Sequence, residues 1–184
     1  MWLGHEILEG LLKDYGVDTV LWGTGEAKTT KDFLEEIVQG ESYLRIDGDG
    51  ILRVVEIVKM LIYHPDHPEW HCLLEVSQML PDGRLRQRMQ NPSGKLKRGE
   101  SPEACLKREL LEELKVQEGT YEYSLIGMHE ESRPSKSYPG LECRYKIHTF
   151  TIRPHVSSLI LQEPVFTIAE DDDTLHTFGW ENHP

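Results

Sequence analysis

Apolar residues near the start of the chain repeat with the period of an α-helix. The first stripe has the spacing i, i+1, i+4, i+5 and consists of Ile7, Leu8, Leu11 and Leu12. Gly16 is a plausible stop for this helix, and a second helix is predicted from Thr29 or Thr30 to Gly40. The apolar side of that second helix consists of Phe33, Leu34, Ile37 and Val38. Residues 1–44 are therefore expected to form a small helical extension.

From Tyr43 onward, the apolar positions change to the alternating or continuous runs that are typical of β-strands. Turn residues punctuate these runs at Asp47-Gly48, at 64–68 and at Asp82-Gly83. The expected strands cover residues 43–47, 51–64, 71–80, 84–90, 122–131, 141–153 and 165–170. Within this β-rich part, one helix is predicted at 102–114. The pattern indicates an α+β or layered α/β fold.

The helix at 102–114 carries a cluster of acidic residues. Ser101 can cap the free amides and Pro102 suits the first turn, so the start of the helix is well defined. At about 100° per residue, Glu109, Glu112 and Glu113 then occupy an arc of about 100°. Three carboxylates so close together repel one another unless a cation lies between them. Mg²⁺ prefers such oxygen ligands, but the solvated face of an ordinary amphipathic helix would show the same cluster.

A longer register surrounds this cluster, and amphipathicity does not require it. In order it reads Gly94, five residues, Glu100, seven residues, Arg108-Glu109-Leu110, one residue and Glu112-Glu113. Here the sequence resembles the Nudix hydrolase family, whose signature is G-x5-E-x7-R-E-U-x-E-E-x-G-U, where U is aliphatic. Val116 fills the last position. The one mismatch is Lys115, which stands where the family has glycine.

The resemblance implies a Nudix-type α-β-α sandwich with a mixed sheet at residues 45–184, behind the extension at 1–44. It implies an Mg²⁺-dependent hydrolase, with Mn²⁺ as a substitute, that cleaves the pyrophosphate linkage of a nucleoside diphosphate derivative. The catalytic set would be Arg108, Glu109, Glu112 and Glu113. The metal would be bound by the Gly94 carbonyl and by Glu109, Glu112 and Glu113, with Glu100 as an outer ligand. Glu100 is equally a candidate partner for Arg108.

Substrate contacts are expected from basic side chains on either side of the signature. Arg86 and Arg88 share one face of a strand and could meet phosphate, although a solvated strand face would look the same. Arg133 and Lys136 lie in a polar segment expected to form a loop, and such loops often determine ligand specificity.

Other side chains are weaker candidates for the same site. Glu130, Glu131 and Glu170 are candidate additional bases. Tyr138 and Trp180 could stack on a nucleobase, but aromatic residues at such positions more often pack in a core.

Composition restricts the partners. The chain has 184 residues with a formal net charge of −12, which argues against long nucleic acid and anionic membranes. Its three cysteines form no CxxC pair, which favours a reducing compartment. The first residues resemble neither a signal peptide nor a membrane span. The expected partner is a small-molecule nucleotide in the cytoplasm, and a homodimer is compatible with the sequence.

Two alternatives remain open at this point. His64, His67 and His71 suggest a zinc site, but the two prolines between them favour a hairpin tip. The Nudix-like domain could also be a nucleotide sensor or a protein-interaction module without turnover. Lys115 and the extension at 1–44 favour that alternative, whereas the complete set of glutamates opposes it.

Overall fold

The computed structural model of the chain describes residues 2–48, 50–67, 72–155, 160, 163–169 and 173–181. The chain divides into two compact units, each assembled from three stretches of sequence. The first unit consists of Met1–Ile57, Lys95–Glu100 and His129–Ile147. The second unit consists of Val58–Gly94, Ser101–Met128 and His148–Pro184.

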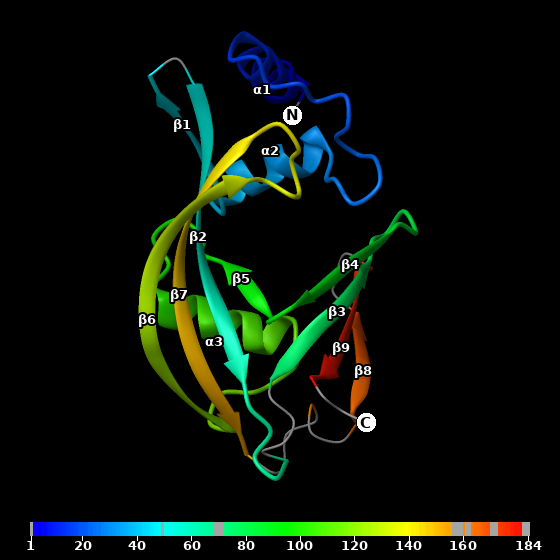
Figure 1. Cartoon of the computed structure of the whole chain (residues 1–184), viewed down its shortest axis with the longest axis vertical. Helices are drawn as coiled ribbons and strands as arrows, with labels where there is room; N and C mark the ends of the chain where they lie inside the picture. Colours follow the sequence, from blue (N-terminus) through cyan, green and yellow to red (C-terminus); the bar gives the residue numbers. More distant parts are fainter. Residues whose placement is uncertain are drawn as a thin grey trace. The chain divides into compact units, whose positions relative to one another are not determined.

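The first unit contains both helices predicted for the extension (Figure 1). Helix α1 spans Trp2–Asp14 and helix α2 spans Thr30–Gln39. A capping box starts α2, because the Thr29 side chain accepts the Asp32 N–H and the Asp32 carboxylate accepts the Thr29 N–H. Gly40 ends α2 in the left-handed conformation, as the sequence predicts. The prediction for Val38 was wrong, because that side chain is 78% exposed.

Three aromatic rings form the centre of the first unit's core. The Trp22 ring centroid lies 5.7 Å from that of Phe33 and 4.9 Å from that of Tyr138. Tyr138 is fully buried in this cluster, so the suggestion that it stacks on a nucleobase was wrong and its packing role is confirmed. The buried cluster consists of Leu8, Leu12, Val17, Trp22, Phe33, Ile51, Tyr138 and Leu141.

The first sheet has the strand order β1-β2-β7-β6, and β5 also pairs with β2 (Figure 1). Its strands are β1 (Tyr43–Asp47), β2 (Gly50–Ile62), β5 (Ser93–Lys95), β6 (Tyr121–Pro134) and β7 (Glu142–Pro154). Strands β1 and β2 pair in antiparallel fashion around the predicted turn at Asp47-Gly48. Strand β6 continues to Pro134, so Arg133 lies at a strand end and not in the expected loop.

The second sheet has the order β4-β3-β9-β8 and lies within the second unit. Its strands are β3 (Leu73–Met79), β4 (Leu85–Gln90), β8 (Val165–Ala169) and β9 (Leu175–Trp180), joined by antiparallel pairs. An irregularity between Glu75 and Ser77 shifts the register of β3 against both neighbours. The sequence did not predict β9, because the polar residues His176 and Thr177 interrupt its apolar pattern.

The helix of the signature is α3 (Pro102–Glu112), also in the second unit. The expected α+β fold, with sheets, a few helices and a helical N-terminal extension, is confirmed. The domain boundary between residues 44 and 45 stays a prediction. In the described part of the chain, no helix combines the length and the hydrophobicity needed to cross a bilayer.

Candidate active site

Helix α3 begins as the sequence predicts. The Ser101 hydroxyl accepts the Ala104 N–H at 3.1 Å, and Pro102 occupies the first turn. The buried face of the helix consists of Cys105, Leu106, Glu109 and Leu110. Leu111, on the same helix, is 51% exposed. Because Glu109 is only 7% exposed, it does not belong to a solvated helix face.

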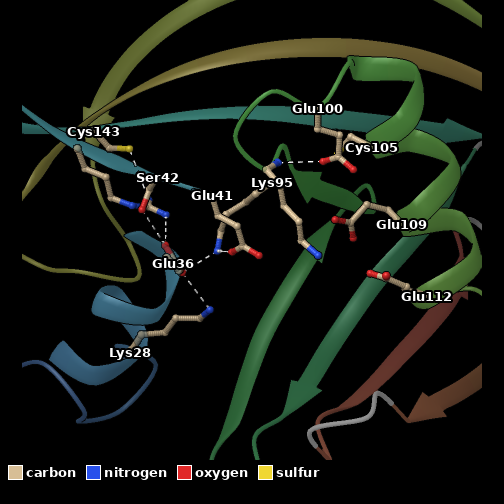
Figure 2. A network of polar contacts seen from close by, with 12 residues as sticks. Lys28, Glu36, Glu41, Ser42, Lys95, Glu100, Cys105, Glu109, Glu112 and Cys143 are labelled. Carbon is tan, nitrogen blue, oxygen red and sulfur yellow. Dashed lines mark hydrogen bonds and ion pairs between the residues drawn. The ribbon is translucent and has the colours of Figure 1, made fainter. Parts of the chain in front are cut away.

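Arg108 joins two of the three clustered glutamates. Its Nη1 donates to Glu109 Oε1 at 2.6 Å and to Glu112 Oε2 at 3.2 Å, while Nη2 lies 3.6 Å from Cys105 Sγ. Figure 2 shows Glu109 and Glu112 along the same side of α3. The guanidinium therefore orients both carboxylates and offsets their mutual repulsion.

The electrostatics of Glu109 differ from those of an exposed glutamate. Burial raises its pKa above the ordinary value, although Arg108 and a hydrogen bond with Glu113 oppose this shift. Glu113 itself is the C-cap residue of α3, and its N–H donates to the Glu109 carbonyl at 2.8 Å. A buried carboxylate with only partial compensation gains most from a nearby cation.

The backbone of Gly94 lies directly against the Glu109 side chain. A Cβ placed on Gly94 would lie 2.0 Å from Glu109 Cγ and 2.1 Å from Cδ. The position therefore requires glycine so that the carboxylate can approach the chain. The first glycine of the signature and its first helical glutamate thus form one local arrangement.

These residues fit a divalent metal by the chemistry of their donors. Glu109 and Glu112 approach the same nitrogen atom of Arg108, and the glycine backbone borders Glu109. Oxygen donors of this kind suit Mg²⁺ or Mn²⁺. Within the described residues, no group of three or more His, Cys, Asp or Glu side chains converges as a metal site. The Arg108 guanidinium supplies the positive charge between Glu109 and Glu112, so a metal ion would have to replace that contact.

Lys115 has a backbone conformation that favours glycine. Its φ is 55°, in the left-handed region, and its Nζ donates to the Glu112 carbonyl at 2.8 Å. The next residue, Val116, is buried, and its N–H donates to the Leu110 carbonyl. The helix therefore ends with the reversal that a glycine would allow, at a cost of about 1 kcal/mol in backbone strain.

Arg86 and Arg88 belong to a buried polar network in the second sheet. Arg86 Nη1 donates to Gln78 Oε1 at 2.9 Å, and Arg88 Nε donates to Glu75 Oε2 at 3.0 Å. Glu75 also lies 2.9 Å from His176 Nδ1. The interpretation as a solvated strand face was wrong, since Arg86 is buried and Arg88 is mostly covered.

Sequence reasoning missed Glu75 and His176 in this network. Burial opposes the ionisation of Glu75, but His176 and Arg88 outweigh it and lower the pKa of its carboxyl group. The signal in the sequence was a lone charged residue inside an apolar strand, at LLEVSQM. Such a residue is buried only when a partner compensates its charge.

The remaining candidates that the structure describes make contacts of their own. Arg133 pairs with Glu131 at 3.0 Å and lies over the Tyr145 ring at 4.7 Å. Lys136 and Glu130 are exposed, and Glu170 lies outside the described residues. Glu100 Oε2 accepts the backbone N–H of Lys97 at 2.9 Å, within the first unit.

The histidine-rich turn shows ring packing. The His64 ring lies 4.7 Å from that of His67 and 5.0 Å from that of Trp180, between centroids. His64 Nδ1 accepts the Asp66 N–H at 3.2 Å, as in a turn. Trp180 is buried, so packing and not base stacking explains it, and His71 lies outside the described residues.

A family model described as the NUDIX domain matches residues 59–180, which is more than half of the chain. The match includes Gly94, α3 and the whole second sheet. Among curated proteins, none matches the sequence.

Several solved structures show similarity. A binary complex of the C. elegans Ap4A hydrolase is 15% identical, with 68% of this chain and 78% of that chain covered and a TM-score of 0.43. A NUDIX hydrolase from Nitrosomonas europaea is 24% identical, covers 54% and 58%, and has a TM-score of 0.33. A structure from work on MutT of Aliivibrio salmonicida and Vibrio cholerae is 17% identical, covers 69% and 78%, and has a TM-score of 0.30. With TM-scores below 0.5, these likenesses add nothing to the family match.

Proposed function

Because this chain belongs to the Nudix family and is therefore a hydrolase of pyrophosphate linkages, we propose that it cleaves a small nucleoside diphosphate derivative with the help of Mg²⁺. The observation that best supports this proposal is the buried Glu109 carboxylate, which lies against Gly94 and bonds to Arg108. A solvated helix face would require neither the burial nor the glycine. A buried carboxylate is compensated when it ligates a hard cation.

Glu109, Glu112 and Glu113 are the proposed metal ligands, together with the Gly94 carbonyl. Mg²⁺ or Mn²⁺, when bound, supplies the positive charge that neutralises phosphate oxygens and acidifies a water. Arg108 orients Glu109 and Glu112 until a metal ion replaces its contact with them, and one carboxylate of the set takes a proton from the attacking water. Glu100 is proposed as an outer ligand.

Arg86 and Arg88 are the proposed phosphate contacts. Gln78 bonds to Arg86, and Glu75, which also contacts His176, bonds to Arg88. Because these bonds hold the two guanidinium groups in fixed positions, the groups lose little entropy when they bind an anion. Arg133 and Lys136 are proposed as secondary contacts. The net charge of −12 argues for a small nucleotide, since a long nucleic acid would be repelled by the rest of the surface.

The test is the turnover of a panel of nucleoside diphosphate derivatives, measured by phosphate release after phosphatase treatment. Glu112→Gln and Glu113→Gln each keep the side-chain shape and remove a ligand charge. We expect each to lower kcat by at least about 10²-fold without a change in Tm. Glu103→Gln, in the first turn of the same helix, is the matched control. Unchanged turnover in both test variants would refute the proposed metal site.

Lys115 no longer favours the alternative of a sensor without turnover. Lys115 adopts the left-handed conformation that favours glycine, and the Val116 N–H still bonds to the Leu110 carbonyl after the helix. Calorimetry with ADP-ribose or a dinucleotide, with and without Mg²⁺, separates the two functions. A sensor would bind the nucleotide intact, whereas the enzyme would convert it.

A further inference from the structure

The signature is divided between the two units of the chain. Its segment 95–100 belongs to the first unit, although Gly94 and the residues from Ser101 onward belong to the second. Peptide bonds join segment 95–100 to Gly94 at one end and to the N-cap of α3 at the other. Any contact that fixes this segment therefore restricts the backbone of Gly94.

The helical extension supplies such contacts. Lys95 Nζ lies 2.6 Å from Glu36 Oε1, on α2, and 3.0 Å from Glu41 Oε2, just after α2. Gly40, the C-cap of α2, approaches the same segment so closely that an added Cβ would lie 2.7 Å from Arg98 Cβ. From β2, the Glu56 carbonyl accepts the Leu96 N–H at 2.9 Å. Segment 95–100 is thus held by α2 and β2.

Glu36 is the centre of the polar network around Lys95 (Figure 2). It is 4% exposed, and besides Lys95 it accepts from Arg53 Nη2 at 2.6 Å and from Lys28 Nζ at 3.2 Å. The Ser42 hydroxyl lies 3.4 Å from the same carboxylate. Burial opposes its ionisation, but Lys95, Lys28 and Arg53 outweigh burial and hold the pKa of Glu36 well below its usual range.

Arg53 is itself fixed, so the network is not a loose surface pair. Its guanidinium lies 5.1 Å from the Tyr138 ring centroid and 3.6 Å from Cys143 Sγ. Removing one member of a buried ionic network is costly, because it leaves an uncompensated charge. The pair Lys31–Glu35, exposed on the same helix at 3.7 Å, has no such surroundings and contributes little.

We propose that Glu36, acting through Lys95, is a positioning residue for the hydrolytic site: it fixes segment 95–100 and thereby the Gly94 backbone on which Glu109 rests. This inference depends on the proposed function, because it assigns a role to Gly94 and Glu109 as parts of a metal site. The inference also assigns a role to the extension at 1–44. Helix α2 contacts segment 95–100, and the remainder of the extension forms the core that holds α2.

The test removes the ammonium group and leaves the rest of the network in place. In Lys95→Met, Glu36 keeps Arg53 and Lys28, so the protein remains folded. We expect the Mn²⁺ concentration for half-maximal activity to rise about tenfold and kcat to fall about tenfold, the range typical for partners of metal ligands. Lys95→Arg retains the charge at Glu36 and should recover most of both values. Lys31→Met is the matched control on α2 and should equal the wild type.

Each result decides between a positioning role and its alternatives. A lower Tm with an unchanged metal requirement and unchanged kcat would show that Lys95 only stabilises the fold, and would overturn the proposal. A higher KM for the nucleotide with an unchanged metal requirement would show a direct substrate contact, and would also overturn it. If Lys95→Arg restores neither the metal requirement nor kcat, the ion pair with Glu36 does not explain the loss, and the proposal is overturned.

Two further measurements separate this inference from the proposed function. Mn²⁺ binding, followed by electron paramagnetic resonance without substrate, should weaken about tenfold in Lys95→Met even if no nucleotide in the panel is turned over. Amide hydrogen exchange at Leu96 should accelerate in the same variant. If the wild type neither turns over nucleotides nor binds Mn²⁺, the proposed function fails. If it does both and Lys95→Met behaves identically in every assay, only the positioning role fails.

Discussion

The Glu109 carboxylate rests on the backbone of Gly94, with no space for a side chain between them. An added Cβ at Gly94 would lie 2.0 Å from Glu109 Cγ, well inside van der Waals contact. Glu109 cannot retreat freely, because it is buried and bonded to Arg108. This contact brings the start and the helix of the signature together.

Gly94→Ala should therefore displace the Glu109 carboxylate. We expect kcat to fall about 10²-fold, since a displacement of the order of 1 Å in a catalytic arrangement has this effect. Overpacking should also lower the free energy of unfolding by about 1–3 kcal/mol. Kinetics and urea unfolding check both effects. Gly127→Ala is the control, because an added Cβ there meets nothing within 4 Å.

Arg108→Lys tests whether the two carboxylates need a guanidinium group. Both carboxylates bond to Nη1, and a lysine keeps the charge but lacks the planar group whose Nη2 lies 3.6 Å from Cys105 Sγ. We expect about a tenfold loss of kcat with Tm nearly unchanged. Lys107→Met, on the same helix, removes an exposed pair with Glu118, which follows the helix, and should leave kcat unaltered. Wild-type kinetics in Arg108→Lys would assign Arg108 a purely electrostatic role.

Lys115→Gly should stabilise the protein. The left-handed conformation at φ 55° costs a lysine about 1 kcal/mol, which glycine avoids. Loss of the exposed bond from Lys115 Nζ to the Glu112 carbonyl removes about 0.5 kcal/mol of this gain. Urea unfolding should show a higher midpoint with an unchanged m-value, and turnover should be retained. A destabilised variant would show that the lysine side chain contributes more than the backbone strain costs.

Glu36→Gln should change how stability depends on pH. The pKa of Glu36 in the folded protein lies below its ordinary value of 4.5, so below about pH 4.5 the unfolded chain binds a proton that the folded chain does not. The stabilisation from Glu36 is complete above that pH and is lost progressively as the pH falls toward the folded-state pKa.

The glutamine variant lacks this ionisation. We expect it to lose about 3–5 kcal/mol near neutral pH, because Arg53, Lys28 and Lys95 are left uncompensated, and less at acidic pH. Urea unfolding at about pH 7 and about pH 4 measures the difference. Glu35→Gln, at the exposed pair on α2, is the control. An equal loss at both pH values would contradict an ionised Glu36 in the folded state.

The sequence by itself determined the features that depend on local chemistry. Thr29 and Gly40 delimit α2, and Ser101 and Pro102 start α3, because capping and backbone preferences act over a few residues. The spacing from Gly94 to Val116 identified the family, because the residues of the signature lie in one continuous stretch of the sequence. The strand β1 and its turn at Gly48 could be predicted because strand patterns and turn residues are also local features.

Only the tertiary structure decided which side chains are buried and what compensates their charge. Glu36 and Val38 stand two positions apart on α2, yet the carboxylate is buried and the valine is exposed, opposite to their hydrophobicity. Arg53 and Lys95, far away in sequence, make this favourable. Glu109 is likewise buried because Arg108 compensates its charge and because Gly94 has no side chain to exclude it. Burial of a charge depends on partners assembled by the fold, and no local pattern records them.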